Sequence, residues 1–171
     1  MSDFSILQLF AEIAVALIGF SAILIALKNP NREFSPADLF RIRLMLFSGF
    51  GTALSALTTL IVFKSVSLSE YSWRIVGYIL CFYSIIGLYI FPKRGIRLRK
   101  TYPNLFTLKI VVFQTGTLIG VFYFSMCISL RWTEQPESLY YFALLLLLIN
   151  STTAFIRTLF YRAEKTTKNT Y

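Results

Sequence analysis

The amino-acid sequence predicts an all-α integral membrane bundle of five transmembrane helices, and three observations carry this prediction. Hydrophobic residues make up 56% of the 171 residues and charged residues only 15%, whereas soluble domains have roughly 45–50% and 25%. Five apolar stretches are long enough to cross a bilayer, which takes about 20 helical residues. The polar segments between them are too short to form a soluble domain, so residues 1–171 are expected to be one transmembrane domain. The predicted helices cover residues 4–27, 39–63, 72–92, 105–130 and 139–161.

The first span, residues 4–27, carries the only carboxylate that lies within a predicted span, Glu12. A charged residue at the centre of a membrane helix costs roughly 2.5–3.5 kcal/mol on insertion scales. Ala16, Gly19 and Ala26 follow Glu12 at helical spacing, and small residues let a second helix approach closely. We therefore expect Glu12 to face a packed or water-lined interior. It would act there either as an ion or proton site or as a hydrogen-bonded packing carboxylate.

The second span, residues 39–63, has a helix-start signature and a polar stripe. Ser35 can cap the helix, Pro36 suits its first turn, and Asp38 occupies the capping-box position. The stripe places four hydroxyl residues on one helix face. Such a stripe either lines a conduit or holds helices together. Its members are Ser48, Thr52, Ser55 and Thr59.

The third span, residues 72–92, is expected to end at Pro92 and Gly95 and to lead into a basic loop. Basic clusters beside a membrane bind anionic lipid at roughly 1 kcal/mol per residue. The alternative is docking of a nucleotide or an acidic cytoplasmic protein. Because no aromatic platform accompanies the cluster, direct nucleic-acid binding is not expected. The loop contains Lys93, Arg94, Arg97, Arg99 and Lys100.

The last two spans, residues 105–130 and 139–161, carry further polar and small residues. Gln114 precedes a Gly116-x-x-x-Gly120 pair, which favours close helix contact. On the last helix, one face bears Asn150, Thr153 and Arg157. Trp73, Trp132 and Tyr140 are expected to belong to an aromatic belt at one membrane surface.

The distribution of basic residues predicts how the chain is threaded. Most of the 17 Lys and Arg residues fall in the first and third connections and in the tail. Because cytoplasmic segments near membrane spans collect Lys and Arg, the N-terminus is expected outside and the C-terminus in the cytoplasm. The expected location is a bacterial inner (cytoplasmic) membrane, with anionic lipids against the basic face.

Catalytic and metal chemistry have little support in this sequence. It contains no His, and its two cysteines, Cys81 and Cys127, fall in different spans. It also lacks the nucleophile-elbow, phosphate-loop and zinc-helix motifs of common enzymes. The chain is therefore not expected to be an enzyme or to hold a metal or cofactor.

Short motifs give the chain a resemblance to known proteins. The first span contains Ala11-Glu12-Ile13-Ala14 and Gly19-Phe20-Ser21-Ala22-Ile23, and the last contains Ala154-Phe155-Ile156-Arg157-Thr158-Leu159. With these motifs the chain resembles a broad group of small bacterial multi-span membrane proteins. The group offers no activity to carry over. The resemblance implies only that Glu12, Gly19 and Arg157 matter together.

The leading expectation is a homo-oligomeric conduit for ions or small solutes, gated by a cytoplasmic partner through the basic loop. Two alternatives stay open. One is a non-conducting membrane scaffold or accessory subunit, which uses its polar stripes for packing. The other is a proton-coupled transporter that uses Glu12.

Overall fold

The computed structural model describes residues 3–26, 35–65, 69–103 and 108–167, and within them the chain forms five α-helices and no strand. Each helix contains a segment long and apolar enough to cross a membrane, so the prediction of five helices with these properties is confirmed. The second, third and fifth helices extend beyond both ends of their predicted spans, and the first begins one residue earlier than predicted. The helices are α1 (Asp3–Ala26), α2 (Pro36–Ser65), α3 (Ser69–Thr101), α4 (Leu108–Ser129) and α5 (Pro136–Thr167).

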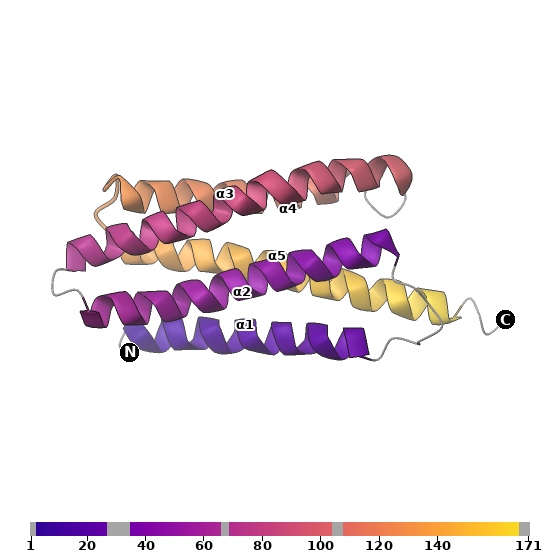
Figure 1. The fold of residues 1–171 in the computed structure, drawn as a ribbon, viewed down its shortest axis with the longest axis horizontal. Helices are drawn as coiled ribbons and strands as arrows, with labels where there is room; N and C mark the ends of the chain where they lie inside the picture. Colours follow the sequence, from indigo (N-terminus) through magenta and orange to yellow (C-terminus); the bar gives the residue numbers. More distant parts are fainter. Residues whose placement is uncertain (1–2, 27–34, 66–68, 104–107, 168–171) are drawn as a thin grey trace.

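The helices form one elongated bundle in which successive helices run antiparallel (Figure 1). Helix α2 packs against α1, α3 and α5, and α4 packs against α3 and α5. Helix α1 is peripheral, because among the described residues it contacts only α2 and α5. We call the end where α1, α3 and α5 begin the tryptophan end, since Trp73 and Trp132 lie there, and the opposite end the basic end.

The start of α2 confirms the predicted cap. The Ser35 hydroxyl accepts a hydrogen bond from the Asp38 amide at 3.2 Å and donates one to Asp38 Oδ2 at 2.7 Å. These bonds satisfy a helix-start donor that would otherwise lack an intrahelical partner. Asp38 Oδ1 also lies 3.4 Å from a guanidinium nitrogen of the buried Arg41.

The expected end of the third span at Pro92 is wrong, because α3 continues through this proline to Thr101. Proline removes only one backbone donor, and tertiary contacts can hold a helix together around it. Here Phe91 is buried against Phe40 at a ring-centroid distance of 5.9 Å, and Gly95 lies against Val111 of α4. The glycine thus marks a close helix contact, and the predicted basic loop is a helical extension.

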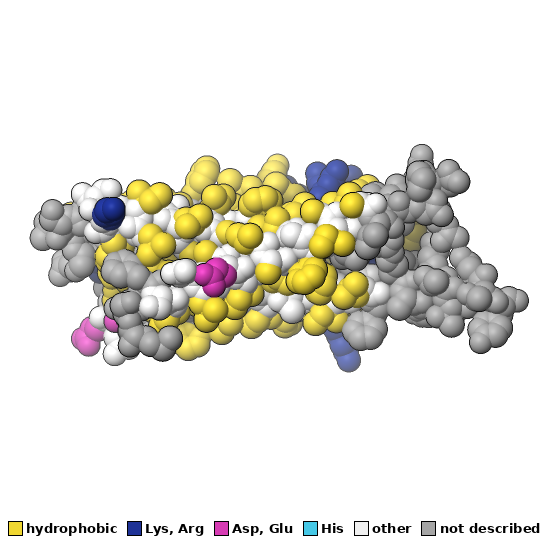
Figure 2. Space-filling model, turned by 90° about the horizontal axis from the view of Figure 1, so that it is seen from below, with side chains coloured by type: hydrophobic (Ala, Val, Ile, Leu, Met, Phe, Trp, Pro, Cys, Tyr) yellow, Lys and Arg dark blue, Asp and Glu magenta, His cyan; other side chains and the backbone are white. Residues whose placement is uncertain are grey.

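The face of the bundle seen in Figure 2 is largely apolar, and all five helices carry exposed large hydrophobic side chains. Large side chains such as Ile61, Phe82 and Tyr89 are about two-thirds exposed. An exposed apolar area of this extent is unusual for a soluble monomer and is what a lipid-facing surface requires. The buried side chains concentrate on α2 and α5, where Leu44, Met45, Leu144 and Leu147 are nearly inaccessible.

Helices α2 and α3 approach closely through an aromatic contact. The rings of Phe47 and Tyr83 stack at 4.3 Å, and the Tyr83 hydroxyl donates to the Phe47 carbonyl at 2.6 Å. A β-carbon added at Gly51 would collide with the Tyr83 ring. Glycine at this position therefore allows the ring to lie across the α2 backbone.

Candidate functional site

The predicted polar stripe of α2 lies in the contact between α2 and α5. Its four hydroxyl residues are all buried, none being more than 5% exposed. We call this contact the α2–α5 polar seam. Its members on α2 are Ser48, Thr52, Ser55 and Thr59, and on α5 they are Tyr140, Asn150 and Ser151.

Two α5 residues bond to α2 in the half of the seam nearer the basic end. Asn150 Nδ2 donates to the Ser48 hydroxyl at 3.1 Å. The Ser151 hydroxyl donates to the Met45 carbonyl, also at 3.1 Å. Asn150 Oδ1 is buried and accepts no hydrogen bond from the described residues. Asn150 and Ser151 therefore both belong to the seam, and of the two only Asn150 was among the predicted polar residues.

Tyr140 forms the other half of the seam. Its hydroxyl donates to the Ser55 carbonyl at 2.9 Å and lies 2.8 Å from the Thr59 hydroxyl. The side chain is fully buried, so its assignment to an interfacial belt is wrong. The helical spacing of the sequence indicates this burial, because Tyr140, Leu144, Leu147 and Ser151 recur every three or four residues and lie on one buried face.

The two threonine hydroxyls of the stripe also contact carbonyl groups of their own helix. Thr52 donates to the Ser48 carbonyl at 3.0 Å, and Thr59 lies 2.8 Å from the Ser55 carbonyl. A stripe that lined a water-filled path would present these groups to solvent. In this protomer they form a hydrogen-bonded helix contact, which favours the packing interpretation.

Glu12 lies on the exposed surface of α1, so the expectation that it faces the interior does not hold within the protomer. Helix α1 instead buries Leu7, Ala14 and Ser21, whose spacing of seven places them on the face that meets the bundle. Glu12 lies on the opposite face, where Gln8 Nε2 donates to Glu12 Oε1 at 2.9 Å. Figure 2 looks onto the α1 side and shows an acidic side chain along the length of the bundle, surrounded by hydrophobic side chains and uncharged white surface.

The predicted small-residue contact is also open in the protomer. Ala16, Gly19 and Ala26 are exposed, and a β-carbon added at Gly19 would meet nothing within 4 Å. We call the exposed set Gln8, Glu12, Ala16, Gly19 and Ala26 the open α1 face. On α4, Gly116 is similarly open, whereas a β-carbon at Gly120 would lie 2.8 Å from Leu146 Cδ1 of α5.

The other predicted residues lie apart from both groups. Gln114 is buried beside a small cavity between α2, α3 and α4, and its Nε2 has no hydrogen-bond partner among the described residues. Thr153 donates to the Ile149 carbonyl of its own helix at 2.7 Å. Arg157 is half-buried towards the basic end, while Glu12 lies in the half of α1 nearer the tryptophan end. The structure therefore does not bring Glu12 and Arg157 together.

The predicted basic cluster lies on the exposed surface of the α3 extension. The Lys93 ammonium is 3.7 Å from the ring centroid of Tyr89, one helical turn earlier. The extension presents five cations at the basic end, at the level where α4 begins. Its exposed cations are Lys93, Arg94, Arg97, Arg99 and Lys100.

No family model, curated protein or solved structure matches this chain. The geometry of the polar seam and of the open α1 face is therefore the basis for the functional argument.

The seam predicts a measurable role for the Tyr140 hydroxyl. Tyr140→Phe should lower the stability of the bundle by about 0.5–1.5 kcal/mol, because membrane interhelical hydrogen bonds contribute on that order. Thermal unfolding in detergent, followed by circular dichroism, measures the effect. Tyr71→Phe is the matched control, since Tyr71 is exposed. Equal melting temperatures for Tyr140→Phe and the parent protein would contradict a stabilising seam.

Proposed function

We propose that this protein is a non-conducting, homo-oligomeric membrane scaffold whose protomers associate through the open α1 face. The observation that carries the proposal is the Gln8–Glu12 pair on the surface of a helix long and apolar enough to span the membrane. Glu12 lies two residues from the middle of the apolar segment Ser5–Ile23, which is about 3 Å along the helix at 1.5 Å per residue. A carboxyl group at this depth is costly against lipid and needs a polar partner.

A second copy of the chain supplies that partner. All copies inserted in one membrane share the same orientation, so two α1 helices meet in parallel with Gln8 and Glu12 at equal depths. The Gln8 amide carries two N–H donors and one acceptor, and only one donor is needed for the bond to Glu12. It can therefore also bond to the neighbouring carboxyl group. Ala16 and Gly19 let the two backbones approach closely enough for these bonds.

The seam supports the non-conducting part of the proposal. The hydroxyl groups of Thr52, Thr59, Tyr140 and Ser151 donate to backbone carbonyls or bond to one another, the Ser48 hydroxyl accepts from Asn150, and all of them are buried. The polar residues that would line a conduit within the protomer are thus used in helix packing.

A conduit between protomers is the second candidate. Glu12 carries the one carboxyl group that lies within the spans and away from their ends, and it lies on the open α1 face. In this version Glu12 serves ion or proton passage along the interface. The α3 extension would then bind anionic lipid or a gating nucleotide or protein partner at the cytoplasmic surface.

We also propose that the basic end faces the cytoplasm of a bacterial inner membrane, as the positive-inside rule indicates. In a variant with Cys81→Ala and Cys127→Ala, a cysteine at Glu134 should react with an impermeant maleimide in intact cells. A cysteine at Arg97 should react only after the cells are opened. The reverse pattern would invert the topology.

Cross-linking tests the α1 contact. In the same cysteine-free variant, Ala16→Cys should form a disulfide-linked dimer under mild oxidation in membranes. Phe82→Cys should not, although Phe82 is exposed and lies about as far along α3 from the tryptophan end. Gly19→Leu should abolish the Ala16→Cys dimer, whereas Gly116→Leu should leave it intact, since both glycines have open space but only one lies on α1.

Flux measurements separate the scaffold from the conduit. Vesicles containing the reconstituted protein and an ion-sensitive dye should show no more flux than empty vesicles between pH 5 and 8. Glu12→Gln should change neither this result nor the oligomer, because glutamine keeps the shape and hydrogen-bonding capacity of the pair. Flux in the parent protein that disappears in Glu12→Gln would replace the scaffold with the interfacial conduit.

A further inference from the structure

A charged cavity of about 440 Å³ lies at the tryptophan end, on the side of the bundle formed by α3, α4 and the start of α5. This volume falls in the range of small-ligand sites, about 300–1,000 Å³. The buried Ile128 and Pro136 form the aliphatic part of its lining, and the other lining residues are polar or aromatic. The lining residues are Trp73, Arg74, Ile128, Arg131, Thr133, Glu134, Pro136 and Glu137.

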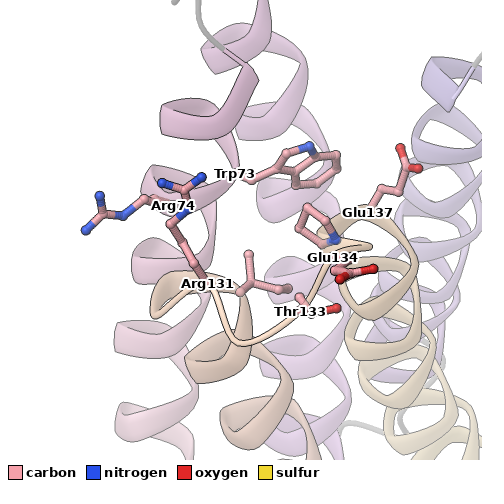
Figure 3. A pocket seen from close by; sticks show the side chains of 8 residues that line it. Trp73, Arg74, Arg131, Thr133, Glu134 and Glu137 are labelled. Atoms are coloured by element: carbon pink, nitrogen blue, oxygen red, sulfur yellow. The ribbon is translucent and has the colours of Figure 1, made fainter.

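Opposite charges occupy opposite sides of this cavity. Figure 3 shows the side chains of Arg74 and Arg131 on one side and those of Glu134 and Glu137 on the other. The two arginines come from α3 and from the end of α4, so two separate elements bring like charges together. A guanidinium group has five N–H donors and can bind an anion while it keeps contacts with the protein.

Trp73 lies between the two charged sides (Figure 3), and two aromatic side chains outside the cavity lining contact its ring. Its ring makes edge-to-face contacts with Phe63 at 4.7 Å and with Tyr140 at 5.7 Å. Tyr140 is itself fixed by the α2–α5 polar seam. An indole held in this way offers a π face to an alkylammonium group, for which tryptophan is the best aromatic partner.

We propose that this cavity binds a zwitterionic group, with its phosphate or carboxylate at Arg74 and Arg131 and its ammonium at Glu134, Glu137 and Trp73. The charge layout carries the inference, because a purely anionic ligand would meet the glutamates and a purely cationic ligand the arginines. Both a phosphoethanolamine lipid headgroup and a free zwitterionic solute have this chemistry. The site is separate from the open α1 face and does not rest on the scaffold proposal.

The backbone at Arg131 supports the assignment. This residue has φ of +61°, in the left-handed region, and follows the end of α4. The Trp132 amide donates to the Cys127 carbonyl at 3.0 Å, which is the bond that closes a helix end with a left-handed residue. Glycine adopts this conformation readily and is the usual residue there. The left-handed backbone therefore does not itself call for arginine, and Arg131 is one of the residues that line the cavity.

Trp73 fluorescence tests the proposal. Trp132 is 72% exposed and does not line the cavity, so Trp132→Phe leaves Trp73 as the only tryptophan. In detergent, this variant should respond saturably to phosphoethanolamine. Inorganic phosphate alone and ethanolamine alone should each need at least about tenfold higher concentrations, since each contacts only one side of the cavity. An equal response to either half would overturn the zwitterion assignment, as would no response to phosphoethanolamine.

A second variant separates binding from folding. Arg131→Gly should keep or raise the melting temperature, because glycine suits the left-handed backbone, while weakening the phosphoethanolamine response about tenfold or more. Arg97→Gln, at the basic end, is the control and should change neither property. A folded Arg131→Gly protein with unchanged binding would overturn the role of the arginine pair.

The source of the zwitterion follows from reconstitution of the same Trp132→Phe protein. In phosphatidylglycerol vesicles, added phosphatidylethanolamine that changes Trp73 fluorescence and blocks the response to free phosphoethanolamine identifies a lipid headgroup. A response to free phosphoethanolamine that phosphatidylethanolamine does not affect identifies a soluble ligand. If Trp73 responds to neither, the proposal is wrong.

Discussion

The hydrogen bonds of the α2–α5 polar seam are the interaction on which the rest of this bundle depends. In a membrane, apolar side chains gain little by leaving lipid for protein, so close packing and polar contacts must specify which helices meet. The seam provides contacts at Met45, Ser48, Ser55 and Thr59 of α2. From Thr59 to Met45 the residue numbers fall along α2, while those of the bonded partners rise along α5 from Tyr140 to Ser151. This is the order that antiparallel helices require. The seam therefore fixes the register of the two central helices, and α1, α3 and α4 pack around them.

Much of the fold could be predicted from local sequence chemistry. Apolar length identified all five helices, and the Ser35–Asp38 cap placed the start of α2 correctly. The end of α3 could not be predicted in this way, because Pro92 and Gly95 are local stop signals. What keeps α3 helical is the packing of Phe91 on Phe40 and of Gly95 on Val111. These partners come from α2 and α4, and no local rule reveals them.

The candidate site, like the fold, could be predicted from the sequence only in part. Helical spacing correctly placed Ser48, Thr52, Ser55 and Thr59 on one face, but the same spacing suits a conduit and a packing seam equally well. The choice depended on Tyr140 and Ser151, whose burial reflects the rotation of α5 in the bundle. Glu12 was expected inside because small residues share its face. The bundle instead uses the face with Leu7, Ala14 and Ser21, whose side chains pack against α2 and α5.

The peripheral position of α1 makes the two proposals compatible. Among the residues that the structure describes, helix α1 contacts α2 and α5 but neither α3 nor α4. The charged cavity is instead lined by α3, the end of α4, the α4–α5 connection and the start of α5. Association through the open α1 face would therefore leave the cavity accessible in every copy. Because all copies share one orientation in the membrane, an assembly would present its cavities at the same surface. Since Trp73 packs on Tyr140, the seam that fixes the register of α2 and α5 also positions the aromatic side of each cavity.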